Sequence, residues 1–108
     1  MPQNFGCTCK IVVAVEAINN LQRYIDDFVQ EPPEKPYEVD ERIVQDRTNW
    51  AIKTLNDAAQ VCGLNLEDVK AKVNLTNLTF KNRKYYVAFD HIIDAKAKLE
   101  SKICVTGV

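Results

Sequence analysis

Two pairs of acidic residues are spaced so that their carboxylates could bind a metal ion. Glu38 and Glu41 form an E-x-x-E pair at the start of an expected helix, and Asp90 and Asp94 would supply a second pair from a facing helix. Four such carboxylates could hold Mg²⁺ for hydrolytic chemistry. Carboxylates at a helix N-terminus are also stabilised by the helix dipole without any ion. We favour this structural interpretation and expect no metal site, no catalytic residue and no cofactor.

The other groups with catalytic potential are isolated along the chain. His91 is the one histidine, so a Ser-His-Asp triad cannot be assembled, and no glycine-rich phosphate-binding motif occurs. Cys7 and Cys9 form a C-x-C pair, but Cys62 and Cys104 are scattered singly, which does not fit a zinc site. We therefore interpret the four cysteines as free thiols in a reducing cytosol.

Length and hydropathy favour one domain without a membrane segment. The chain has 108 residues, of which 46% are hydrophobic and 27% charged, and a formal net charge of −1. The longest apolar run, residues 11–15, ends at Glu16 and is far shorter than the roughly 20 residues of a membrane helix. Residues 1–6 lack a secretory signal pattern, so we expect a soluble, cytoplasmic protein. In that setting the Asn-x-Thr sequons at Asn74 and Asn77 are interpreted as coincidental.

The first half of the chain carries two helical patterns. Residues 10–17 are β-branched and favour a strand buried on both faces, followed by an amphipathic helix to residue 30. The alternative is one unbroken helix over residues 10–30, because the apolar residues also fit a heptad. A proline-rich acidic connector at residues 31–40 leads to a second helix, which runs to Cys62 and ends at Gly63 in a left-handed conformation.

The second half predicts a sheet. Apolar and polar residues alternate over 69–76, as in a half-buried strand, and a turn at 80–83 leads to a returning strand at 85–89. A short helix from Asp90 to Ser101 and a last strand at 103–108 follow. The expected fold class is α+β, a βαββαβ-like (ferredoxin-like) antiparallel sheet with helices on one face plus an extra helix. The alternative is an all-α helical bundle.

Charge is unevenly distributed along the chain. Residues 31–46 hold six acidic and two basic side chains, whereas residues 69–108 hold eight basic and three acidic ones. We predict a small oligomerising interaction domain that uses the open sheet face and the basic hairpin, with an acidic protein or a neighbouring copy as partner. Single-stranded nucleic acid is a second alternative, because basic and aromatic residues occur together, although the net charge argues against it. The predicted partner-binding residues are Lys70, Lys72, Lys81, Arg83, Lys84 and Tyr86.

One stretch resembles a known enzyme family. Residues 48–77 are similar to the reactive-intermediate deaminases in Thr48, Ala51, Leu55, Gly63, the run 66–69, Lys70, Val73, Leu75, Thr76 and Asn77. The resemblance implies a trimeric enzyme that hydrolyses enamines and imines in a pocket between subunits. That family anchors the substrate carboxylate with an arginine before a Cys-Val strand, whereas Lys102 stands two residues before Cys104 here, and lysine lacks the bidentate fork. This enzyme alternative would use Lys102, Cys104, Tyr85 or Tyr86.

Overall fold

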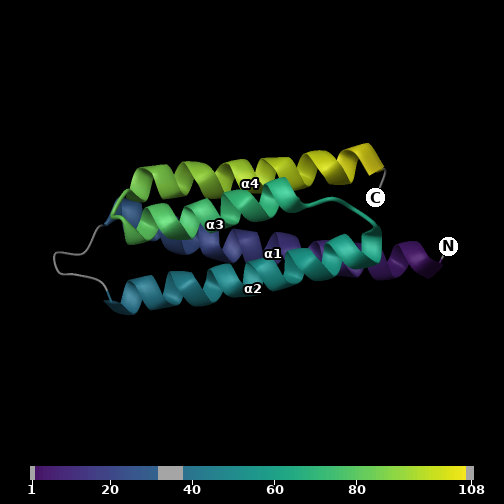
Figure 1. Ribbon diagram of the computed structural model, residues 1–108, viewed down its shortest axis with the longest axis horizontal. Helices are drawn as coiled ribbons and strands as arrows, with labels where there is room; N and C mark the ends of the chain where they lie inside the picture. Colours follow the sequence, from purple (N-terminus) through teal and green to yellow (C-terminus); the bar gives the residue numbers. More distant parts are fainter. Residues whose placement is uncertain (1, 32–37, 107–108) are drawn as a thin grey trace.

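A computed structural model describes residues 2–31 and 38–106, which fold as four α-helices (Figure 1). The helices are α1 (Pro2–Gln30), α2 (Glu38–Cys62), α3 (Glu67–Lys81) and α4 (Tyr85–Thr106). No strand occurs within the two described ranges. The predicted α+β class, with its ferredoxin-like sheet and hairpin, is therefore wrong, and the all-α helical bundle is the observed fold.

The four helices lie at the corners of a square. α1 packs against α2 and α4, and α3 packs against the same two helices. Helices that follow one another in the chain run antiparallel (Figure 1). The resulting rod measures 52 × 20 × 19 Å. Because α3 is the shortest helix, the loop at residues 63–66 covers the core near the chain termini, where Leu66 is buried.

Residues 10–17, which were predicted to form a strand, belong to the long helix α1. Its buried residues recur every three or four positions, which is the helical period. They are Cys7, Ile11, Ala14, Ala17, Ile18, Leu21, Ile25 and Phe28. Val12 and Val13 are 54% and 42% exposed, although a strand buried on both faces would have covered them. The single helix over residues 10–30 is thus confirmed, and the strand at 10–17 is wrong.

The α2 helix agrees with its sequence pattern. Val44, Thr48, Ala51, Leu55 and Ala58 are buried along one stripe. Three acidic residues occupy the first turn, where the helix dipole favours negative charge. Gly63 follows the last turn with a φ of 66°, as predicted for a left-handed helix end. Residues 32–37 of the predicted connector lie outside the described part of the chain.

The α3 helix replaces the predicted strand at 69–76. Its buried residues are Val69, Val73, Thr76 and Phe80, a spacing of four, three and four residues. In the predicted half-buried strand, Leu75 would share the apolar face with Val69 and Val73, but it is 37% exposed. A helix satisfies its backbone groups internally, whereas a strand needs a neighbouring strand to do so. The period of the buried residues is therefore helical, and the surface alternation is incidental.

The α4 helix merges three predicted elements into one. Ala88, Ile92, Ala95 and Leu99 are fully buried at helical spacing, so the strand at 85–89 and the strand over the described residues 103–106 are wrong. The predicted helix at 90–101 is present but longer, and Asp90 lies inside α4. Residues 107–108 are outside the described part of the chain.

A disulfide joins the first two helices. Cys7 near the start of α1 is bonded to Cys62 at the end of α2, which overturns the free-thiol interpretation for these two residues. Cys9 is exposed and carries a free thiol, and the side chain of Cys104 is outside the described set. Disulfides are rare in a reducing cytosol. The cytoplasmic location stays a prediction, and the disulfide argues against it.

Candidate functional site

The turn between α3 and α4 gathers four of the six predicted partner-binding residues. Lys81, Arg83, Lys84 and Tyr86 are all exposed there, with Tyr86 at 73%, and we call this group the basic corner. The connection is short because three backbone amides bond back into the last turns of α3. Asn82 N–H donates to Leu78 O (3.1 Å), Arg83 N–H to Phe80 O (2.9 Å) and Lys84 N–H to Thr79 O (2.9 Å).

The backbone at Arg83 has an uncommon conformation. Its φ is +64°, in the left-handed region that costs a non-glycine residue roughly 1–2 kcal/mol. Asparagine or glycine is the usual residue in this conformation. The chain therefore keeps a long cationic side chain at the tip of the turn despite this cost.

A cluster of aromatic rings supports the basic corner from below. Phe80 at the end of α3 and Tyr85 at the start of α4 have ring centroids 5.1 Å apart, and Phe28 of α1 lies 4.9 and 4.6 Å from them. Sequence reasoning missed this cluster because Tyr85 was assigned to a strand. The packing joins both ends of the turn to α1.

The cations of the basic corner differ in their partners. Lys81 Nζ donates to Gln45 Oε1 at 2.5 Å, and Asn77 Nδ2 donates to the same oxygen at 3.1 Å. Arg83 and Lys84 form no ion pair with residues 2–31 or 38–106. Two positive charges are thus left without a counter-charge in the described chain.

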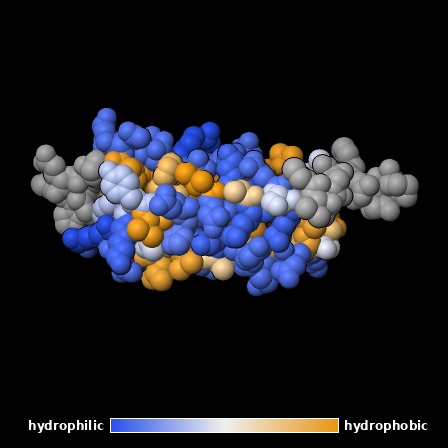
Figure 2. Space-filling model, turned by 90° about the horizontal axis from the view of Figure 1, so that it is seen from above, coloured by the Kyte–Doolittle hydropathy of each residue, from blue (hydrophilic) through white to orange (hydrophobic). Residues whose placement is uncertain are grey.

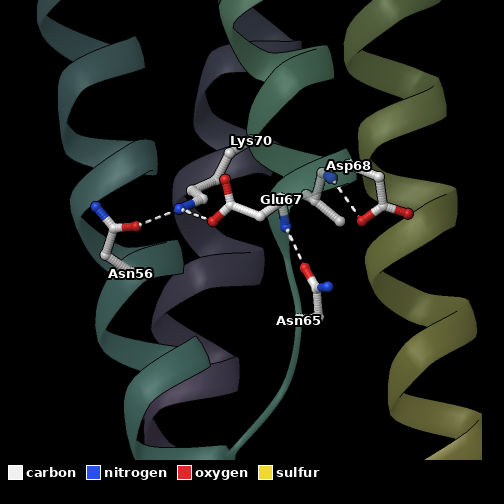
Figure 3. Close-up of polar contacts among 6 residues, drawn as sticks. Asn56, Asn65, Glu67, Asp68 and Lys70 are labelled. Atoms are coloured by element: carbon white, nitrogen blue, oxygen red, sulfur yellow. Dashed lines mark hydrogen bonds and ion pairs between the residues drawn. The ribbon is translucent and has the colours of Figure 1, made fainter.

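Lys70 and Lys72 do not belong to this group. Lys70 Nζ contacts Glu67 Oε2 at 2.5 Å and donates to Asn56 Oδ1 of α2 at 2.8 Å (Figure 3). Lys72 pairs with Asp94 of α4 at 3.2 Å. At a rise of about 1.5 Å per residue, Lys70 lies roughly 16 Å along α3 from the basic corner. The structure therefore separates the six predicted residues into a corner and two internal ion pairs.

Two side chains beside Lys70 bond to backbone amides at the start of α3 (Figure 3). Asn65 Oδ1 accepts a bond from the Glu67 N–H at 3.0 Å, and the Asp68 carboxylate accepts one from the Val69 N–H at 2.9 Å. These bonds satisfy amides that a helix start leaves without intrahelical partners. Lys70 thus links α2 and α3 at the surface of the bundle, through Asn56, in addition to its ion pair with Glu67.

An open pocket of about 300 Å³ lies between the end of α1 and the start of α2. Its lining residues are Tyr24, Asp27, Phe28, Glu31 and Asp40. The Tyr24 hydroxyl donates to Asp40, and burial together with this bond raises the pKa of Tyr24 to about 12. The phenol therefore stays protonated near neutral pH and does not serve as a base. Among the described residues, the pocket is thus lined by three carboxylates and two aromatic side chains.

The candidate residues for metal binding are not brought together. Glu38 and Glu41 lie in the first turn of α2, and Asp94 is paired with Lys72. No cluster of three or more metal-binding side chains occurs among the residues described here. The structure therefore gives no geometric support to the magnesium alternative.

Two of the four groups proposed for the enzyme alternative, Lys102 and Tyr85, have structural contacts. Lys102 pairs with Asp68 at 3.3 Å. Burial raises the pKa of Asp68, but bonds from Lys102 and from the Val69 N–H lower it by more, so the net pKa is below its usual value. Tyr85 belongs to the aromatic cluster, and Cys104 and Val105, which would correspond to the Cys-Val strand of the deaminases, belong to the α4 helix here. The resemblance to that family is not supported by the fold.

The face seen in Figure 2 is mostly hydrophilic, and its hydrophobic residues form several separate patches. No described helix is long and apolar enough to span a membrane.

Comparison with models of known protein families, with curated proteins and with solved structures gives no match for this chain. The class of protein shown is an antiparallel four-helix bundle with a disulfide between α1 and α2.

Proposed function

We propose that this bundle is a binding module that recognises an acidic protein surface through the basic corner. The observation that carries the proposal is the exposure of Arg83 and Lys84 without an ion pair to the described residues, on a turn fixed by aromatic packing. Arginine binds carboxylates in a bidentate geometry, which suits exposed aspartate and glutamate. Tyr86 adds a large exposed ring of the type that anchors protein interfaces.

Electrostatic attraction would set the rate and specificity of such binding. The chain has a net charge of −1, so the attraction is local and does not arise from the whole molecule. At physiological salt, the interaction between exposed charges is screened over a distance of roughly 8 Å. We therefore expect binding that weakens strongly when salt is added.

A second copy of the chain is one acidic partner of suitable charge. Asp27, Glu31 and Asp40 surround the pocket between α1 and α2, at the same end of the bundle as the basic corner (Figure 1). A two-fold arrangement would place the acidic group of each copy on the basic corner of the other. Homo-oligomerisation through this end is thus a proposal that sedimentation at low and high salt can check.

The direct test uses a fluorescein-labelled poly-glutamate peptide as the probe. Fluorescence anisotropy should show binding at 50 mM salt that weakens at least tenfold at 300 mM. The triple variant Lys81→Glu/Arg83→Glu/Lys84→Glu should lose at least tenfold in affinity at low salt, because it reverses the charge of the corner.

The matched control reverses two lysines and one arginine elsewhere. Lys10→Glu/Arg23→Glu/Lys53→Glu changes the net charge by the same amount at exposed sites of α1 and α2. Its affinity should change less than threefold. Equal losses in both triple variants, or tighter binding of a single-stranded oligonucleotide of the same charge, would show that the corner does not recognise acidic protein.

A further inference from the structure

The two Asn-x-Thr sequons lie one turn apart on α3 but in different surroundings. Asn74 is exposed, whereas Asn77 is half-buried. Both match the acceptor sequence for N-linked glycosylation, which takes place in the secretory pathway. Sequence alone treats the two sequons as equivalent, and the fold makes them distinct.

Asn77 is part of the contact between α2 and α3. Its Nδ2 donates to Gln45 Oε1 at 3.1 Å, and its Oδ1 is buried without a hydrogen-bond partner. A sugar on Nδ2 would have to occupy the space between α2 and α3, where Nδ2 lies 3.1 Å from Gln45 Oε1. The folded bundle is therefore incompatible with a glycan at this position.

Asn74 has no such restriction. Its side chain is at the surface of α3, and no hydrogen bond or ion pair of Asn74 with the described residues is present. The exposed apolar side chains of Leu75 (37%) and Leu78 (54%) belong to the same helix. A glycan at Asn74 would shield this part of α3 from water and from other proteins, and it would leave the basic corner about 10 Å away along the helix.

The disulfide indicates a suitable compartment. A bond between Cys7 and Cys62 is expected where the environment is oxidising, as in the secretory pathway. We propose that Asn74 is an acceptor site for an N-linked oligosaccharide and that Asn77 is unmodified in the folded protein. This inference does not depend on the function of the basic corner.

The transfer involves a glycosyl donor and no change of oxidation state. Asn74 Nδ2 forms a bond to C1 of the first sugar of a polyprenyl-diphosphate-linked oligosaccharide. The C1–O bond to the diphosphate breaks, the lipid diphosphate leaves with the electron pair, and the amide nitrogen loses one proton. In the finished fold the Thr76 hydroxyl is buried and donates to Lys72 O at 2.8 Å. Transfer therefore precedes the docking of α3, and only chains in which Asn77 has stayed unmodified can then form the contact between α2 and α3.

The experiment is expression of the full chain behind a secretion signal in cultured animal cells. The intact mass of the secreted protein is measured before and after treatment with peptide N-glycosidase, which converts a glycosylated asparagine to aspartate. We expect one glycan per chain, with the conversion at Asn74. Mapping the conversion on the wild-type protein keeps the result independent of any variant's folding.

Two variants of equal chemistry complete the test. Asn74→Gln should be secreted without a glycan, and Asn77→Gln should keep its single glycan. Secreted wild-type protein without a glycan, or with the conversion at Asn77, would overturn the proposal. The thermal unfolding midpoint of each secreted protein is measured in parallel, and a glycan at Asn77 in a protein of unchanged midpoint would also contradict the packing argument.

Discussion

Reduction of the Cys7–Cys62 disulfide is expected to lower the free energy of unfolding by about 4 kcal/mol. The bond closes a loop with a sequence separation of 55 residues. For a loop of this length the chain-entropy relation gives about 14 cal/mol/K, or about 4 kcal/mol at 25 °C, because the crosslink restricts the unfolded chain. With roughly 2.1 cal/mol/K of unfolding entropy per residue, the midpoint should fall by about 18 °C.

Circular dichroism during heating can measure this shift. The oxidised protein is compared with the same protein in a phosphine reductant and with Cys7→Ala/Cys62→Ala, which removes both thiols together. The reduced protein and the double variant should agree within about 1 kcal/mol, since both lack the crosslink and keep the helices. Cys9→Ser is the matched control, because Cys9 is exposed and outside the disulfide, and its midpoint should not change.

Two outcomes would refute the reasoning. Alkylation and mass analysis first establish whether the oxidised protein has the crosslink between Cys7 and Cys62. If the crosslink is present and reduction moves the midpoint by less than about 5 °C, the loop-entropy argument fails for this bundle. If the oxidised protein shows alkylation of both cysteines without reduction, the packing of α1 on α2 at this end is wrong.

Three further predictions concern single side chains. Thr48 is 1% exposed, and its hydroxyl has no hydrogen-bond partner in the described chain. Thr48→Val should therefore raise the free energy of unfolding, measured by urea titration, by about 1 kcal/mol. Thr76→Val removes a hydroxyl that donates to Lys72 O and should not raise the free energy of unfolding. Arg83→Gly should raise the free energy of unfolding by roughly 0.5–1 kcal/mol by relieving the positive φ, while it weakens poly-glutamate binding. The pKa of Tyr24 is raised to about 12 by burial and by the bond to Asp40, so its contribution to stability is complete below about pH 10 and is lost as the pH rises through 12. Tyr24→Phe should make the alkaline loss of stability shallower, and equal slopes for both proteins would contradict this assignment.

Part of the fold could be predicted from sequence because some patterns have one structural solution. The stripe from Val44 to Ala58 fits only the helical period, and Gly63 marks its end, so α2 was predicted correctly. The region 69–76 was ambiguous, since Val69 and Val73 are four residues apart and suit either a helix face or a strand face. Phe80 extends the helical spacing, but its assignment to a turn removed that signal.

The candidate site was predicted in part for the same reason. The clustering of Lys81, Arg83 and Lys84 is local in sequence, so any fold keeps these three together. The separation of Lys70 and Lys72 from them depends on α3 being a helix, which points the two lysines toward α2 and α4 respectively.

The sequence by itself determined the helical stripe of α2, the breaks at the proline-rich connector and Gly63, and the uneven charge, because these depend on neighbouring residues. Only the tertiary structure decided that residues 69–76 are helical and that Cys7 meets Cys62. Packing against α2 and α4 stabilises the conformation that buries Val69, Val73, Thr76 and Phe80 together. This stabilisation comes from contacts between residues that are far apart in the chain, and the local sequence pattern does not show which residues will meet.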